Sequence, residues 1–156
     1  MSRAVFGFTL LASLGAIAAA LVTQYGFDMQ PCPWCVLQRL VFAALALVGL
    51  LGLLWRARTG RRVAATLGVV LAALGVAAAL WQHVVAAHST SCNLTLADRI
   101  ISGAQLDVWL PQVFAATASC ADAAVSLFGL PYEYWSLALF AVLGVALMMA
   151  LLQRGR

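Results

Sequence analysis

Four long apolar runs, separated by more polar segments, dominate the 156-residue chain. A helix needs about 20 apolar residues to cross the ~30 Å hydrocarbon core of a membrane. The predicted spans are residues 4–22, 36–55, 63–85 and 134–152. This pattern predicts an all-α membrane protein, a four-transmembrane-helix bundle that forms a single domain over residues 1–156.

The placement of arginine indicates how this bundle is oriented. Arg99 and all five acidic residues fall on one side of the predicted spans, outside the apolar runs. Seven other arginines fall on the opposite side: Arg3, Arg56, Arg58, Arg61, Arg62, Arg154 and Arg156. Cytoplasmic loops of membrane proteins carry an excess of Arg and Lys. We therefore expect both termini in the cytoplasm and two extracytoplasmic loops, at about residues 23–35 and 86–133.

The first apolar run has some features of a secretory signal peptide. Arg3 precedes it, and small residues are frequent over positions 16–20. The apolar core of a signal peptide is usually 7–15 residues long, and this run is longer. We therefore expect it to be retained as the first span, and cleavage would leave the rest of the topology unchanged.

The composition agrees with a membrane protein. The chain is 65% hydrophobic and 9% charged, with a mean hydropathy of +1.01. A soluble domain needs far more polar surface to cover its core. The net charge of +4 does not indicate nucleic-acid binding, because the chain has no lysine and most of its arginines lie at the ends of apolar runs. We expect contact with membrane lipid and none with nucleic acid.

The second outer loop contains an apolar patch around Pro111. Its residues are Leu106, Val108, Trp109, Leu110, Val113 and Phe114. Such a patch can pack against the bundle like an ordinary loop. It can also form a short interfacial segment, with Trp109 at the level of the lipid headgroups. We favour the interfacial segment.

All four cysteines lie in the predicted outer loops, on the side where disulfides persist. Cys32 and Cys35 form a C-x-x-C at the mouth of the second span, and Cys92 and Cys120 lie in the long loop. An even number of cysteines in two separated pairs indicates two disulfides. Three pairings are possible, and Cys32–Cys35 with Cys92–Cys120 is the most natural.

Other uses of the four cysteines fit the sequence less well. A structural zinc site usually has two short-spaced pairs, whereas Cys92 and Cys120 are 28 positions apart, so we expect no metal. A c-type haem site needs His directly after the C-x-x-C, where the chain has Val36. Purely structural disulfides remain an alternative, because closing the Cys92–Cys120 loop would contribute about 3–4 kcal/mol in the loop-entropy model. A C-x-x-C ring constrains little chain and is more typical of a reactive pair.

The residues around the C-x-x-C favour a reactive thiol. Pro33 suits the first turn of a helix, and the partial positive charge at a helix start stabilises a thiolate. Arg39 lies four positions after Cys35 and therefore faces the same side, one turn deeper. A charge inside a span is costly and marks a candidate functional residue. The alternative is that Arg39 reaches back to the interface as an anchor.

Three stretches, taken with this topology, closely resemble the disulfide bond formation protein B (DsbB) family over nearly the whole chain. The most specific is PCPWCVLQR at residues 31–39, a C-x-x-C followed four residues later by arginine. The others are WLPQVF at residues 109–114, six residues before Cys120, and FGLP at residues 128–131. The cysteine order also matches, with the C-x-x-C in the first outer loop and a spread pair in the second.

The resemblance implies a quinone-dependent protein-dithiol oxidase in the inner membrane of a bacterium. Its partner would be a periplasmic DsbA-like protein of the thioredoxin fold, and its cofactor a quinone, either ubiquinone or menaquinone. The partner would attack the Cys92–Cys120 disulfide at Cys92, and electrons would then pass to Cys32–Cys35 through an interloop disulfide. Cys35 would deliver them to the quinone. Arg39 would stabilise both the Cys35 thiolate and the quinone as it gains charge.

His83 ends the third predicted span on its outer side. A histidine there is more often just an interfacial polar residue, but the family has a quinone-proximal histidine at a similar place. The resemblance therefore adds His83 to the cofactor-binding residues, whereas His88 is assigned to the loop. The chain departs from the family at Gln38, where a better-known branch carries an acid. This leaves open whether the partner is DsbA itself or a specialised relative.

Two other functions are compatible with parts of the pattern. A vitamin K epoxide reductase-like oxidase also has four spans and a quinone, but its C-x-x-C usually follows the loop pair in sequence. A non-catalytic, disulfide-stapled membrane subunit would need neither the short C-x-x-C nor Arg39. Quinone-dependent oxidation of a reduced dithiol protein would distinguish these functions.

Overall fold

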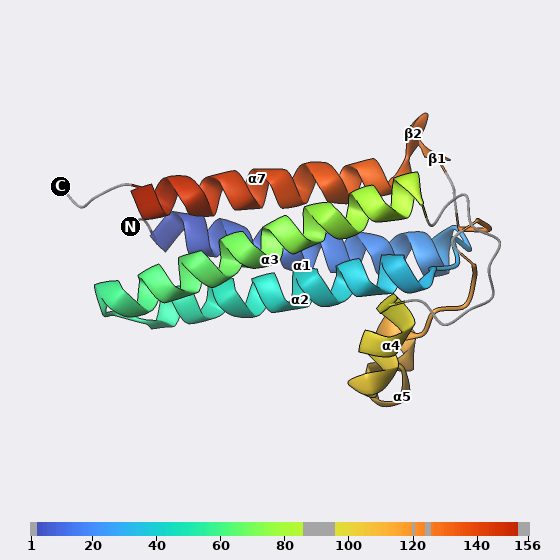
Figure 1. Cartoon of the computed structure of the whole chain (residues 1–156), viewed down its shortest axis with the longest axis horizontal. Coiled ribbons are helices and arrows are strands. Elements are labelled where there is room, and N and C mark those ends of the chain that lie inside the picture. Colours follow the sequence, from blue (N-terminus) through green and yellow to red (C-terminus); the bar gives the residue numbers. More distant parts are fainter. Residues whose placement is uncertain (1–2, 86–95, 120, 124–125, 153–156) are drawn as a thin grey trace.

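Four long helices make up the body of the protein (Figure 1). The computed structural model describes residues 3–85, 96–119, 121–123 and 126–152. The long helices are α1 (Arg3–Gly26), α2 (Pro33–Leu54), α3 (Arg58–Val84) and α7 (Tyr132–Leu152). Each is long and apolar enough to cross a membrane. The prediction of an all-α, four-helix membrane protein is confirmed.

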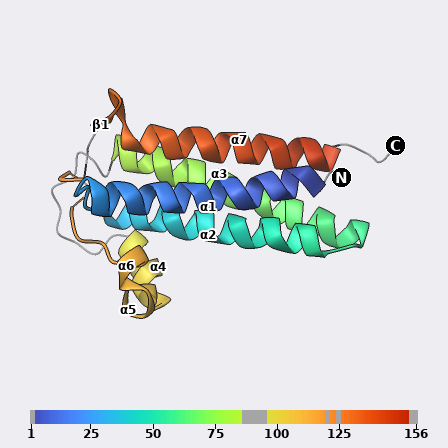
Figure 2. The ribbon, with the colours of Figure 1, turned by 180° about the vertical axis from the view of Figure 1, so that it is seen from behind.

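The helices run alternately up and down, so chain segments that are distant in sequence meet at the two ends of the bundle. The start of α1, the α2–α3 turn and the end of α7 share one end (Figures 1 and 2). The α1–α2 connection, the end of α3 and the start of α7 share the other. The main packing pairs are α1 with α2, α2 with α3, and α3 with α7. Helix α2 is therefore central, and half of its most apolar window is buried, against 22% for α1 and for α7.

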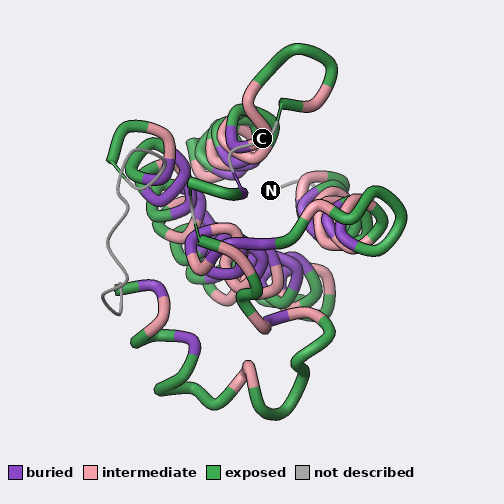
Figure 3. Tube along the Cα trace, turned by 90° about the vertical axis from the view of Figure 1, so that its right-hand side faces the viewer, coloured by how far each residue is buried: buried purple, intermediate pink, exposed green. Residues whose placement is uncertain are grey.

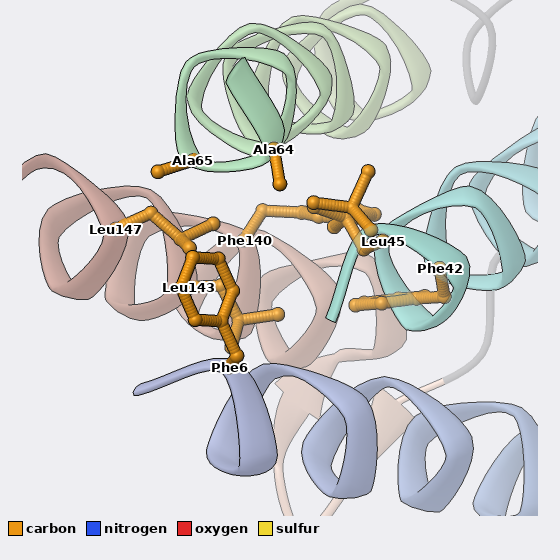
Figure 4. Packing of buried hydrophobic residues seen from close by; sticks show 9 residues of the cluster. Phe6, Phe42, Leu45, Ala64, Ala65, Phe140, Leu143 and Leu147 are labelled. Atoms are coloured by element: carbon orange, nitrogen blue, oxygen red, sulfur yellow. The ribbon is translucent and has the colours of Figure 1, made fainter. Parts of the chain in front are cut away.

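Buried aromatic and aliphatic side chains fill the middle of the bundle (Figure 4). Phe42 and Phe140 stack with ring centroids 4.1 Å apart and planes inclined by 9°. Leu45 of α2 and Leu143 of α7 are fully buried in the same cluster. Many large apolar residues of the long helices are exposed, and Figure 3 shows exposed residues along each of these helices. That distribution suits helices whose outer faces contact lipid tails.

Glycines allow the helices to approach closely. A Cβ atom built on Gly49 would lie 2.8 Å from the Leu10 backbone nitrogen of α1, and one on Gly75 would lie 2.5 Å from the Phe140 ring of α7. A Cβ on Gly52 would collide with the Phe6 ring. Small residues at such crossings are typical of helix association in membranes, where van der Waals contact replaces the hydrophobic effect.

Helices α1, α2 and α7 extend beyond the predicted apolar runs at the end of the bundle that carries the C-x-x-C. Helix α1 continues through Thr23 and Gln24 to Gly26, although these polar residues were expected to end the span. Gln24 is buried, because its side chain finds a partner inside the bundle. Helix α2 begins at Pro33, three residues before the predicted start at Val36. Polar residues at a span end can thus belong to the helix when the fold supplies their hydrogen bonds.

Three short helices of the second outer loop lie beside the outer end of α2 (Figures 1 and 2). They are α4 (Leu96–Gly103), α5 (Leu106–Trp109) and α6 (Pro111–Phe114). Phe114 and Ile101 pack against Val36 of α2, whereas Val108 and Trp109 are exposed. The apolar patch thus divides: one part packs on the bundle, and an exposed part is left that suits the predicted interfacial segment.

A small hairpin leads into the last long helix. Its strands, β1 (Ser126–Leu127) and β2 (Leu130–Pro131), pair antiparallel, with Leu127 opposite Leu130. The turn between them requires positive φ at Phe128 (54°) and Gly129 (80°). Glycine adopts that conformation without steric cost, so the FGLP stretch folds as a tight turn directly before α7.

Gly75→Ala tests the close contact of α3 with α7. The added methyl group would meet the Phe140 ring, which is buried against Phe42 and cannot easily move. We expect a loss of about 1–3 kcal/mol in stability, seen as a lower melting temperature in detergent. Gly15→Ala of α1 is the matched control, because nothing lies within 4 Å of its Cβ position. Equal stability of the two variants would contradict the packing described.

Candidate functional site

The Cys32–Cys35 motif forms the start of helix α2. Cys32 is the N-cap, with extended backbone (φ −86°, ψ 167°), and Pro33 occupies the first helical turn as predicted. The Cys35 backbone N–H donates to the Cys32 Sγ at 3.3 Å, so the thiol performs the capping role usually taken by Ser or Asp. The two Sγ atoms are 2.8 Å apart. A small movement is enough to bring them to bonding distance.

The two cysteines differ in how far they are buried. Cys32 is fully buried, packed with Trp34, Leu37 and residues of the outer loop, whereas Cys35 is partly buried. The predicted second pair, Cys92 and Cys120, lies outside the described residues, as does His88. The pairing of Cys92 with Cys120 therefore remains a prediction.

A buried glutamine of α3, Gln82, contacts the Cys35 sulfur, and a second buried glutamine, Gln38 of α2, holds Gln82 in place. Gln82 Nε2 donates a hydrogen bond to Cys35 Sγ at 3.2 Å. Gln38 Nε2 in turn donates to Gln82 Oε1 at 2.7 Å, which fixes the orientation of the Gln82 amide. A hydrogen bond of this kind strengthens when the sulfur is ionised. Sequence reasoning gave Gln38 and Gln82 no role in the site, although Gln38 lies within the 31–39 stretch and Gln82 directly precedes His83.

Arg39 is buried, with 6% of its surface exposed. Its Nη1 donates to Gln24 Oε1 of α1 at 2.6 Å and to the Val113 carbonyl oxygen of α6 at 3.0 Å. Its Nη2 donates to the Ala20 carbonyl oxygen at 3.3 Å. Among the residues that the structure describes, no carboxylate lies within ion-pair distance of the guanidinium. Arg39 thus stays within the protein, and its positive charge is left to act on groups beside it.

A cavity of about 370 Å³ opens between α1, α2 and α7, and both Cys35 and Arg39 line it. Small side chains of α1, Ala16, Ala19 and Ala20, leave the space. The rest of the lining is Thr23, Gln38, Phe42, Gln82, Leu127, Tyr132, Glu133, Trp135, Ser136 and Leu139. A mostly apolar cavity with a few convergent polar groups is typical of a small-molecule site.

His83 lies beside this cavity but does not line it. Its Nδ1 is 2.8 Å from Glu133 Oε1, and its Nε2 is 3.1 Å from the Tyr134 hydroxyl. Both ring nitrogens therefore have protein partners, and the side chain that reaches the cavity is Glu133. Sequence reasoning counted Glu133 only as an acid of the outer loop. It stands directly before the predicted span 134–152, and at such a position the sequence does not distinguish a side chain that faces water from one that faces the bundle.

Comparison with known proteins shows which family the chain is similar to. The model of the family described as disulfide bond formation protein DsbB matches residues 2–150. A disulfide bond formation protein B of Herminiimonas arsenicoxydans is 32% identical over 148 residues, 94% of this chain and 93% of that protein. A disulfide bond formation protein B of Ralstonia nicotianae is 31% identical over 157 residues, covering 99% and 97%.

A third relative, disulfide bond formation protein B 1 of Pseudomonas savastanoi pv. phaseolicola, is 35% identical over 134 residues, 85% of this chain and 79% of that protein. The family match runs from the start of α1 into α7, and each of these three relatives covers at least 85% of the chain. The protein therefore belongs to the DsbB family of membrane-bound, disulfide-forming oxidoreductases.

Proposed function

We propose that this protein reoxidises a DsbA-like periplasmic dithiol oxidase and passes the electrons to a membrane quinone. The observation that carries the proposal is that the Cys35 thiol and the Arg39 guanidinium line the same largely apolar cavity. A thiol at the outer end of a membrane bundle can meet a water-soluble partner through the loops. The cavity beside it can admit a lipid-soluble acceptor.

The proposed relay uses all four cysteines. The partner dithiol exchanges with the Cys92–Cys120 disulfide, beginning with attack at Cys92. The reduced loop pair then exchanges with Cys32–Cys35 through an interloop disulfide. Each exchange swaps one S–S bond for another by thiolate attack, so no external oxidant is used until Cys32 and Cys35 are both reduced.

The cavity suits a quinone headgroup. Its volume lies in the range of small-molecule sites, and alanines, Phe42 and Leu139 offer apolar contacts to a ring and an isoprenoid tail. Arg39 and the Gln38–Gln82 pair provide polar contacts at the Cys35 side. His83 contributes to the site through Glu133. A bound quinone supplies a two-electron acceptor for the dithiol, whether it is ubiquinone or menaquinone.

The residues around Cys35 prepare it for this role. The start of α2 and the Gln82 amide both favour negative charge on sulfur. Arg39, which lacks a carboxylate partner among the described residues, adds its charge in a partly dry site where electrostatic interactions exceed those in water. These groups hold the Cys35 thiolate ready and stabilise negative charge that develops beside it.

We place the protein in the bacterial inner membrane, with both termini cytoplasmic and the cysteine loops periplasmic. The described arginines that flank the spans, Arg3 and the four of residues 56–62, lie at the bundle end opposite the C-x-x-C (Figure 1). The positive-inside rule assigns that end to the cytoplasm.

The direct test is oxidation of a reduced thioredoxin-fold dithiol protein by the purified protein and a short-chain quinone. We expect one quinol for each disulfide formed, and complete loss in Cys35→Ser. Without quinone, oxidation should stop once the protein's own disulfides are used. Continued turnover without quinone, or a protein that never oxidises the dithiol, would contradict the proposal.

Topology can be tested with alkaline phosphatase fusions. A fusion after Cys92 should be active, because alkaline phosphatase folds only in the oxidising outer compartment. A fusion after Arg58 should be inactive. The reverse pattern would overturn the proposed orientation and the role of the cysteine loops.

Arg39→His tests whether Arg39 interacts with the quinone or only anchors helix α2. Losing the planar, permanently charged guanidinium should lower turnover at limiting quinone by about 10²-fold, mostly through a higher apparent KM for quinone. Arg39→Lys should be milder because it keeps a point charge. Exchange between Cys92–Cys120 and a reduced partner without quinone should survive in both variants.

Arg99→His is the matched control, because Arg99 is an exposed arginine of the outer loop helix α4. It should turn over like the wild-type protein. Normal turnover of Arg39→His at limiting quinone would show that Arg39 is an anchor between α1, α2 and α6 and nothing more.

A further inference from the structure

A short chain of proton-carrying side chains connects the outer surface to the cavity. Tyr134 and His83 lie on the outside, and the His83 side chain is 37% exposed. Glu133 lies on the inside, with 6% of its surface exposed, and lines the cavity together with Cys35 and Arg39. The Nδ1 of His83 and the Oε1 of Glu133, 2.8 Å apart, join the two. A proton can pass along such a contact without either side chain leaving its place.

We infer that Glu133 delivers protons to the acceptor in the cavity and that His83 resupplies Glu133 from the outer aqueous side. This inference rests on the proposed quinone reduction and names the residue that protonates the quinone oxygen. His83 then acts as a positioning and resupply residue, because its own ring nitrogens contact Glu133 and Tyr134 rather than the cavity.

The proton balance shows why such a route is needed. Oxidation of Cys32 and Cys35 to the disulfide forms one S–S bond and releases two electrons and two protons. Reduction of a quinone to a quinol consumes two of each. Thiols that react as thiolates have already released their protons to the medium, so these protons must be returned to a site beneath the outer surface. Because the protons are both released and taken up on the outer side, no net charge crosses the membrane.

Glu133 is well suited to this step among the described cavity-lining groups. The Arg39 guanidinium keeps its protons throughout the physiological range, and the Gln38 and Gln82 amides do not ionise. Cys35 is the reductant itself. A carboxyl group can accept a proton and pass it on, and a general acid of this kind contributes about 10²–10⁴-fold to a rate.

A purely structural role would make a different prediction. The His83–Glu133 contact also ties α3 to α7, and a glutamine could make that tie with its amide oxygen. Proton transfer requires the acid, whereas the hydrogen bond to His83 does not. Glu133→Gln therefore separates the two roles, because it keeps the shape and a hydrogen-bond acceptor for His83 but cannot ionise.

The experiment is a single turnover of the full-length protein, reduced at its cysteines and mixed with a decyl-substituted benzoquinone. Quinol formation is followed by absorbance across a range of pH, in H₂O and in D₂O. We expect Glu133→Gln to slow quinol formation by about 10²-fold, to flatten its pH dependence, and to enlarge the solvent isotope effect. Other ionisable side chains lie in or beside the cavity and stay as in the wild-type protein. They are Cys35, Arg39, Tyr132, His83 and Tyr134.

Two further measurements do not depend on quinone reduction. Binding of the same quinone to the oxidised protein, followed by quenching of tryptophan fluorescence, should be unchanged in Glu133→Gln; Trp135 lines the cavity and can report it. Thiol exchange with a reduced dithiol protein should also be unchanged.

The matched control is Asp28→Asn, because Asp28 is an exposed acid of the first outer loop. This variant should match the wild-type protein in every measurement. Asn can also accept the hydrogen bond from Gln30, and it tolerates the positive φ of 52°.

The inference is overturned if Glu133→Gln forms quinol at the wild-type rate, or if weaker quinone binding accounts for the whole loss. Should Glu133→Gln fail to insert, Glu133→Asp replaces it: the acid is kept but its reach is shorter, so a roughly tenfold loss is expected, and an unchanged rate overturns the inference. A wild-type protein that binds but never reduces the quinone would instead contradict the proposed function.

Discussion

The buried guanidinium of Arg39 is the constraint on which the outer half of this protein depends. A charge within a membrane bundle is expensive and must be hydrogen-bonded. Arg39 meets that requirement with uncharged acceptors, the Gln24 side chain and the carbonyl oxygens of Ala20 and Val113. These acceptors come from α1 and from the loop helix α6. One side chain of α2 therefore holds together three segments that are far apart in the sequence.

The use of neutral acceptors has an electrostatic consequence. A carboxylate partner would cancel most of the field of the guanidinium in the cavity, whereas amide and carbonyl dipoles satisfy its N–H groups and leave its charge. The neighbouring polar groups Gln38 and Gln82 are also uncharged. Glu133 also lines the cavity, but its carboxyl group contacts His83, so a thiolate at Cys35 is the counter-charge that arises beside Arg39 during the reaction. Such an arrangement is preorganised for a charge that is not yet present.

The fold was predictable from the sequence because it depends on the length of apolar runs and on the positions of arginines. The C-x-x-C, Pro33 and Arg39 were also recognisable, since each is unusual where it stands. Gln24, Gln82 and Glu133 were not, because a polar residue at the end of an apolar run has the same appearance whether it faces water or another helix. Only the packing of α1, α2, α3 and α7 shows that these three side chains are buried.

The N-cap of α2 links redox state to local helix stability. Cys32 Sγ accepts the Cys35 N–H, so a Cys32 that leaves to bond a loop cysteine also leaves the helix start uncapped, at a cost of about 1 kcal/mol. Linkage works in both directions. A tighter first turn would keep Cys32 beside Cys35 and disfavour the cross-loop bond, whereas a looser one would populate it. The folding energy of a single helical turn thus becomes part of the equilibrium between competing disulfides.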